Sequence, residues 1–148
     1  FTFVAADALT MKVREGGRVV SCAVLVATGV NNDGHREVLG VRTSTSETGP
    51  AWNEFFADLV ARGLSGVRLV TSDAHLGLVE AIAANLPGAT WQRCRTHYAA
   101  HLMSVTPKAL WPAIKAMLHS VQPARRGIGQ RSIRPALGLR ARQAPHRV

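Results

Sequence analysis

The sequence predicts an α/β fold built on a mixed β-sheet. Apolar runs rich in β-branched residues come first, helical periodicity follows, and short apolar strands then alternate with helices. With 148 residues, of which 47% are hydrophobic, the chain is long enough to bury one sizeable core.

The first third of the chain is typical of three strands joined by tight turns. The strands are expected at residues 1–6, which end at Asp7, and at 18–28 and 36–43. The run after Asp7 continues to a turn at 15–17, and Asn-Asn-Asp-Gly at 31–34 is typical of a hairpin turn. We therefore expect an antiparallel meander.

The pattern then changes to that of a helix, because large apolar residues recur at positions 52, 55, 56, 59 and 60. Pro50 lies near the first turn of this helix, and Gly63 is a natural stop. Beyond it we expect a strand at 66–72, a helix at 76–86, a strand at 89–92, and helices at 95–103 and 110–119. A right-handed crossover through the first helix makes the fourth strand parallel to the first, as in ribonuclease-H-like folds.

Charge divides the chain into a core region, residues 1–120, and a tail, residues 121–148. The net charge is +9, but residues 1–120 hold 11 Lys and Arg against 9 Asp and Glu, whereas residues 121–148 hold seven Arg and no acid. The tail is rich in Arg and Pro and has no apolar period, so we expect it to be disordered. The abrupt change in composition at residue 121 is also typical of a frameshift relative to an intact gene.

The composition excludes several classes of protein. Cys22 and Cys94 form no disulfide framework, which favours a reducing, cytoplasmic location. The longest apolar run is too short to span a bilayer, so no membrane association is expected. The chain has no Walker loop, dinucleotide-binding glycine motif or hydrolase nucleophile elbow.

Two acids follow predicted apolar strands. Asp7 and Asp73 lie where a parallel strand pair would bring them together, and close carboxylates repel unless a cation joins them. Mg²⁺ favours such oxygen ligands, and a two-ion centre can activate a water or a 3′-hydroxyl. The alternative for Asp73 is a helix N-cap, and for Asp7 a turn or edge position.

Cys94 and His97 form a C-x-x-H pair close to Trp91. A structural zinc site needs about four ligands, and no second pair of this kind is present in the sequence. From spacing alone, packing or hydrogen bonding is the expected role of these three residues.

Several segments of the chain together carry a resemblance to a known protein family. They are residues 7–20, 27–40 and 59–67, Ser72-Asp73-Ala74-His75, and Trp91-Gln92-Arg93-Cys94-Arg95-Thr96-His97-Tyr98. Together, over about residues 1–120, they resemble the ribonuclease-H-like catalytic core of Mutator-type insertion-sequence transposases. They are similar to mycobacterial and other actinobacterial members.

The resemblance implies a mechanism with three acids, in which Asp7 and Asp73 bind Mg²⁺ or Mn²⁺. The family's third acid is a Glu, and no Glu follows Glu80 here. We therefore expect a truncated core that does not catalyse by itself. The resemblance also makes Cys94, His97 and Trp91 functional candidates.

The partners that the resemblance implies are the terminal inverted repeats of an insertion sequence, target DNA, and a second copy of the chain. The residues expected to contact DNA are Arg93, Arg95, Arg125 and Arg126. Two other functions stay open: a non-catalytic DNA-binding remnant that uses the Arg tail, and an unrelated ribonuclease-H-like nuclease. The nuclease would need Glu37 or Glu47 near Asp7.

Overall fold

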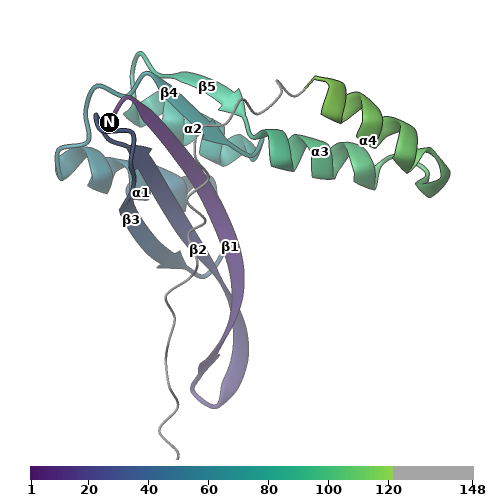
Figure 1. Ribbon diagram of the computed structural model, residues 1–148. Coiled ribbons are helices and arrows are strands. Elements are labelled where there is room, and N and C mark those ends of the chain that lie inside the picture. Colours follow the sequence, from purple (N-terminus) through teal and green to yellow (C-terminus); the bar gives the residue numbers. More distant parts are fainter. Residues whose placement is uncertain (122–148) are drawn as a thin grey trace, which may run out of the picture.

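The computed structural model describes residues 1–121, so the predicted disordered tail lies outside the described residues except for Val121. The described part contains five strands and four α-helices (Figure 1). In chain order they are β1 (Phe3–Glu15), β2 (Arg18–Val30), β3 (Arg36–Ser44), α1 (Gly49–Ala61), β4 (Leu69–Ser72), α2 (Leu76–Asn85), β5 (Thr90–Arg93), α3 (Arg95–Ser104) and α4 (Trp111–Ser120). A 3-10 turn at Lys108–Leu110 leads into α4.

The strands form one mixed sheet in the order β3-β2-β1-β4-β5. β1, β2 and β3 are successive antiparallel neighbours, β4 is parallel to β1, and β5 is parallel to β4. The predicted ribonuclease-H-like sheet, an antiparallel meander followed by parallel strands with crossover helices, is confirmed.

The core lies between the sheet and helices α1 and α2, which cover one of its faces (Figure 1). α1 buries its aromatic stripe of Trp52, Phe55 and Phe56, as the helical spacing predicts. Each such side chain contributes roughly 1.5–3 kcal/mol through burial of apolar surface. The Thr48 hydroxyl accepts a hydrogen bond from the Ala51 N–H at the start of α1, and Gly63, with φ 103°, follows its end.

β1 is longer than the sequence predicts, and Asp7 lies inside it rather than after it. β1 and β2 pair along their full length, from Phe3 opposite Val30 to Glu15 opposite Arg18. The neighbouring strands stop earlier, since β4 pairs with β1 only as far as Ala5. Every residue from 9 to 21 is exposed, so this segment lacks the one-sided burial pattern that marks a half-buried strand.

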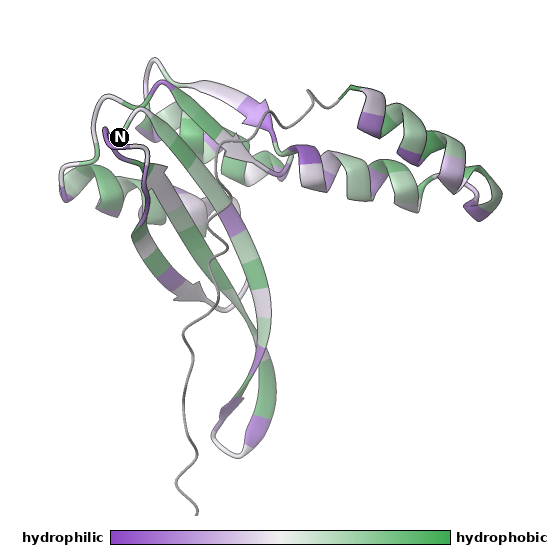
Figure 2. Ribbon diagram, viewed as in Figure 1, coloured by the Kyte–Doolittle hydropathy of each residue, from purple (hydrophilic) through white to green (hydrophobic). Residues whose placement is uncertain are grey.

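Helices α3 and α4 project from the sheet as an arm, and neither contains a buried residue (Figure 1). Where this arm leaves the sheet, the end of β5 is hydrophilic, and a hydrophilic residue also lies partway along β1 (Figure 2). Within residues 1–121, no helix has the length and apolarity needed to cross a membrane.

Candidate active site

Asp7 lies on β1, and Asp73 directly follows β4, the parallel neighbour of β1. The β1–β4 pairing joins Phe3 to Leu69 and Ala5 to Thr71, a constant difference of 66 in residue number. Two residues further along, the same difference joins Asp7 to Asp73. Adjacent strands lie roughly 4.8 Å apart, so this register, continued two residues past its last pair, would set Asp7 opposite Asp73.

Both acids belong to the sheet face that α1 and α2 leave uncovered. Val4 and Ala6 on β1 are buried against the helices, as are Val70 and Ser72 on β4. Side chains alternate between the two faces of a strand, so Asp7 points to the opposite face, and Asp73 follows the same alternation.

Local backbone groups orient the two carboxylates. Asp7 Oδ1 accepts a hydrogen bond from the Ala8 N–H at 2.9 Å, and Asp73 Oδ1 accepts one from the His75 N–H at 3.2 Å. Among the described residues, neither acid forms an ion pair with Lys or Arg. The alternative of Asp73 as the helix N-cap is wrong, because His75 caps α2 and its Nδ1 accepts from the Leu78 N–H.

Cys94 extends this row of positions to a third strand. β4 and β5 pair in parallel with Ser72 opposite Arg93, so Asp73 and Cys94 are the next residues on each strand. The Cys94 N–H donates to the Ser72 carbonyl, and α3 begins directly afterwards with Cys94 as its N-cap. Asp7 thus lies within β1, whereas Asp73 and Cys94 directly follow the ends of its parallel neighbours β4 and β5.

The first turn of α3 carries His97 back to Asp7. His97 Nε2 lies 3.7 Å from Asp7 Oδ1, and 41% of the His97 side chain is exposed against 51% of Asp7. His97 Nδ1 is buried and has no hydrogen-bond partner within the described residues. The C-x-x-H spacing therefore places Cys94 beside the end of β4 and His97 beside β1.

The cluster shifts the pKa of both residues. Burial acts to raise the pKa of the Cys94 thiol, but the backbone N–H groups of His97 and Thr96 and the His97 ring outweigh it, so the pKa is lowered. Burial acts to lower the pKa of His97, but the Cys94 sulfur and the charges of Asp7 and Asp73 outweigh it, so the pKa is raised. Both shifts favour a thiolate beside an imidazolium.

Trp91 and Ser72 support the site from the buried side of the sheet. Trp91 Nε1 donates to Ser72 Oγ at 2.9 Å, and Ser72 Oγ donates to the Asp73 carbonyl at 2.8 Å. Ser72 is buried, with 1% of its surface exposed. Sequence reasoning missed Ser72, although a small hydroxyl residue directly before a candidate acid at a strand end was a usable signal.

The four arginines expected to contact DNA differ in position. Arg93 ends β5, and its guanidinium lies 5.4 Å from the centre of the Tyr98 ring. Arg95 is exposed at the start of α3. Arg125 and Arg126 lie outside the described residues.

Within residues 1–121, no group of three or more His, Cys, Asp and Glu side chains is close enough to hold a metal ion. Glu37 accepts a hydrogen bond from Asn31, and Glu47 accepts one from Trp52. Neither therefore completes a three-acid cluster with Asp7, and the nuclease alternative gains no support from them. The site consists of two carboxylates, with a thiol and an imidazole beside them.

A family model described as "Transposase, Mutator family" matches residues 1–126 of the chain. A transposase for insertion sequence element IS1081 from Mycobacterium tuberculosis is 64% identical over 121 residues, which are 82% of this chain and 29% of the relative. A transposase for insertion sequence element ISRM5 from Rhizobium meliloti is 44% identical over 108 residues, which are 73% of this chain and 27% of the relative. The chain thus spans less than a third of these relatives' length.

Among solved structures, the chain is similar to one in the cryo-electron microscopy structure of a simian T-cell lymphotropic virus intasome in complex with PP2A regulatory subunit B56 gamma. The TM-score is 0.39 and the sequence identity 11%, over 86% of this chain and 50% of that chain. A similarity this weak gives no information about the candidate active site.

Proposed function

The chain belongs to the Mutator family of transposases, and on that premise we propose that Asp7 and Asp73 hold a divalent cation at the centre where the intact enzyme cuts and joins DNA strands. The observation that supports the proposal is the β1–β4 register, which pairs Ala5 with Thr71, two residues before each of the two acids.

The two residues fit Mg²⁺ or Mn²⁺. Mg²⁺ is usually bound by one or two carboxylates, with waters and substrate phosphates completing its octahedral shell. Asp7 and Asp73 supply those two carboxylates without a competing Lys or Arg ion pair among the described residues. Asp7 is half exposed, which leaves room for a phosphate and for water.

A divalent cation there supplies Lewis acidity to a phosphate oxygen and lowers the pKa of a bound water or hydroxyl. The chain's own residues hold and orient the two carboxylates. The Ala8 and His75 N–H groups each bond one Oδ1 atom, and His97 faces Oδ1 of Asp7. Such outer partners fix the orientation of ligand side chains.

The proposed substrate is DNA at the ends of an insertion sequence, together with the target into which the element is joined. Arg93 pairs with Ser72, the residue before Asp73, and Arg95 begins α3 directly after Cys94; we assign both to phosphate groups of the DNA. The two cysteines of the described residues are free thiols, which favours activity in the cytoplasm.

We propose further that these 148 residues do not complete the centre. The resemblance calls for a third acid, and no Asp or Glu follows Glu80 in the sequence. A two-carboxylate site leaves more of the cation's coordination to water, so binding is weaker than in a three-acid site.

Iron-directed cleavage of the protein backbone tests the metal site. Fe²⁺ replaces Mg²⁺, and ascorbate with hydrogen peroxide then cuts the chain near the bound ion. We expect cuts near residues 7 and 73, and the loss of both in Asp7→Asn and in Asp73→Asn. Asp33→Asn, which removes an exposed acid in the β2–β3 turn, is the matched control and should leave the cuts unchanged. Cuts that persist in either site variant would contradict the proposal.

A strand-cleavage assay on labelled duplex DNA tests the incompleteness. The purified chain should show no Mg²⁺-dependent cleavage above background. Cleavage that requires Mg²⁺ and disappears in Asp7→Ala would show instead that two acids suffice.

A further inference from the structure

The β1–β2 hairpin extends beyond the sheet as a two-stranded ribbon, residues 9–21 (Figure 1). β4 stops pairing with β1 at Ala5, and β3 pairs with β2 only from Ala23 onward. Every residue of the ribbon is exposed. An isolated two-stranded hairpin is marginally stable in water, so a ribbon of this kind gains from a partner.

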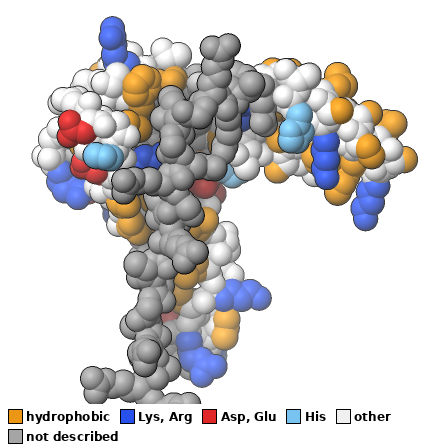
Figure 3. Space-filling model, viewed as in Figure 1, with side chains coloured by type: hydrophobic (Ala, Val, Ile, Leu, Met, Phe, Trp, Pro, Cys, Tyr) orange, Lys and Arg blue, Asp and Glu red, His pale blue; other side chains and the backbone are white. Residues whose placement is uncertain are grey.

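The ribbon is positively charged. It contains Lys12, Arg14 and Arg18 and one acid, Glu15. None of the three cations takes part in an ion pair within the described residues. Figure 3 shows Lys and Arg side chains near the end of the ribbon, on the part that projects from the body.

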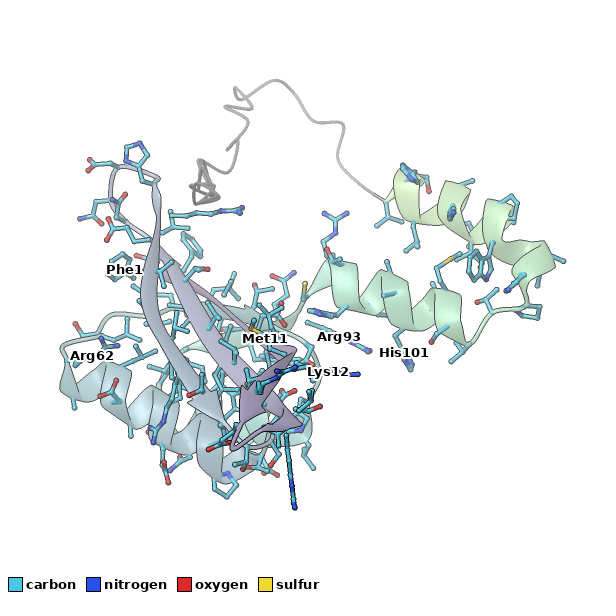
Figure 4. The ribbon with its side chains drawn as sticks, turned by 90° about the horizontal axis from the view of Figure 1, so that it is seen from below. Phe1, Met11, Lys12, Arg62, Arg93 and His101 are labelled. Atoms are coloured by element: carbon cyan, nitrogen blue, oxygen red, sulfur yellow. The ribbon has the colours of Figure 1, made fainter. Side chains whose placement is uncertain are left out.

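Lys12 and Arg14 lie two residues apart on β1, so they point to the same face of the ribbon. Their cross-strand partners, Ser21 and Val19, carry no charge. In Figure 4, where the molecule is seen from below, Lys12 points toward the side on which α3 and Arg93 lie. α3 also carries His97, whose Nε2 lies 3.7 Å from Asp7 Oδ1.

We propose that this ribbon is a contact for duplex DNA, with Lys12 and Arg14 binding the phosphate backbone beside the Asp7–Asp73 site. The inference rests on the proposed function, which makes DNA the substrate, and adds a surface that positions it. Asp7 and Lys12 are five residues apart on one strand, or roughly 17 Å at 3.4 Å per residue. One strand of duplex DNA advances about 3.4 Å per nucleotide, so the contact falls about five base pairs from the site.

Two properties favour duplex DNA over an acidic protein as the partner. A two-stranded β-ribbon fits the major groove, and the groove is lined by phosphates on both sides. Asp7, Lys12 and Arg14 also lie on the same β-strand, β1. A duplex that is bound at Asp7 and runs along this strand therefore passes the ribbon.

Fluorescence anisotropy with the full 148-residue chain and a labelled duplex of random sequence tests the proposal. All measurements contain EDTA, so the Asp7–Asp73 metal site plays no part and the two proposals fail separately. Lys12→Ala/Arg14→Ala is compared with Arg36→Ala/Arg68→Ala, which removes the same charge at the opposite end of the sheet. Each phosphate contact adds roughly 0.9 to the slope of log K against log salt, so we expect the ribbon variant to lose about 1.8.

The control variant should keep the wild-type slope. Equal losses in the two variants would mean that only net charge matters, and an unchanged ribbon variant would assign binding to the Arg-rich tail; each result overturns the proposal. Absence of any binding by the wild-type chain overturns it as well, while the iron-cleavage test of the metal site stands unaffected.

Lysine acetylation gives a second readout that does not depend on a variant. The chain has three lysines, Lys12, Lys108 and Lys115. Bound duplex should protect Lys12 from acetylation, as measured by mass spectrometry, more than it protects the two lysines of the α3–α4 arm. Equal protection of all three lysines, or none at Lys12, contradicts the ribbon contact.

Discussion

His97 and Asp7 come from segments 90 residues apart in the sequence, yet His97 Nε2 lies 3.7 Å from Asp7 Oδ1. The carboxylate is one of the groups that raise the pKa of His97, with burial opposing it and the Cys94 sulfur assisting. We predict that Asp7→Asn lowers the pKa of His97, measured by NMR titration of the ring protons in metal-free protein. A raised pKa stabilises the fold while His97 is protonated, and this stabilisation is lost as the pH rises through the folded-state pKa. An unchanged His97 pKa in Asp7→Asn would show that the two side chains do not interact in solution.

The Cys94 thiol is predicted to react by way of a thiolate stabilised by the first turn of α3. Burial acts to raise its pKa, but the backbone N–H groups of His97 and Thr96 and the His97 ring outweigh that effect. The rate of iodoacetamide alkylation at Cys94, followed by mass spectrometry across pH, should shift to higher pH in His97→Gln. Cys22 lies on β2, so its profile serves as the internal control and should not move. If the pH dependence of Cys94 alkylation is the same in His97→Gln as in the wild-type chain, the His97 ring does not stabilise the thiolate.

Gly77 is predicted to be intolerant of a side chain, because α2 begins against the start of α1. A Cβ atom at Gly77 would lie 2.6 Å from the Gly49 Cα, whereas one at Gly49 would lie 3.4 Å from the Gly77 Cα. Gly77→Ala should therefore destabilise the fold by about 1–3 kcal/mol through overpacking, in urea unfolding followed by circular dichroism. Gly49→Ala, an ordinary contact, should cost much less. Similar losses in the two variants would count against this close approach.

Trp91 is predicted to stabilise the end of β4 through Ser72. Trp91→Phe removes the 2.9 Å hydrogen bond to the buried Ser72 hydroxyl, which should cost about 0.5–1.5 kcal/mol of unfolding free energy. The Asp73 amide resonance should shift, because Ser72 Oγ also bonds the Asp73 carbonyl. Trp111→Phe removes a comparable bond, to the Thr106 carbonyl in the α3–α4 arm, and should leave the Asp73 resonance in place. The prediction fails if both variants move that resonance alike.

Most of the fold follows from the sequence because its signals are local. The aromatic stripe of α1 has helical spacing, and Gly34, with φ 81°, closes the predicted β2–β3 turn. The end of β1 was predicted too early, although residues 9–14 alternate between apolar and polar side chains, the period-2 pattern of a strand; these residues are all exposed in the structure. Whether residues 122–148 form a disordered tail stays a prediction.

The parallel pairing of β1 with β4, the strands next to Asp7 and Asp73, was predictable from a right-handed crossover. The place of Cys94 and His97 was not, because it depends on the β4–β5 register and on the first turn of α3. Spacing alone therefore favoured a packing role for this pair. The structure brings both residues to the candidate active site.

Paramagnetic broadening by Mn²⁺ tests the shared cation most directly. Amide signals of the full chain are recorded by NMR while Mn²⁺ is added, a method suited to the weak binding expected of two carboxylates. We predict that the signals of Asp7 and Asp73 broaden together at the same Mn²⁺ concentration, and that Asp73→Asn abolishes the broadening at Asp7. Broadening at Asp7 that survives Asp73→Asn, or that follows a separate titration, would contradict a cation held between the two strands.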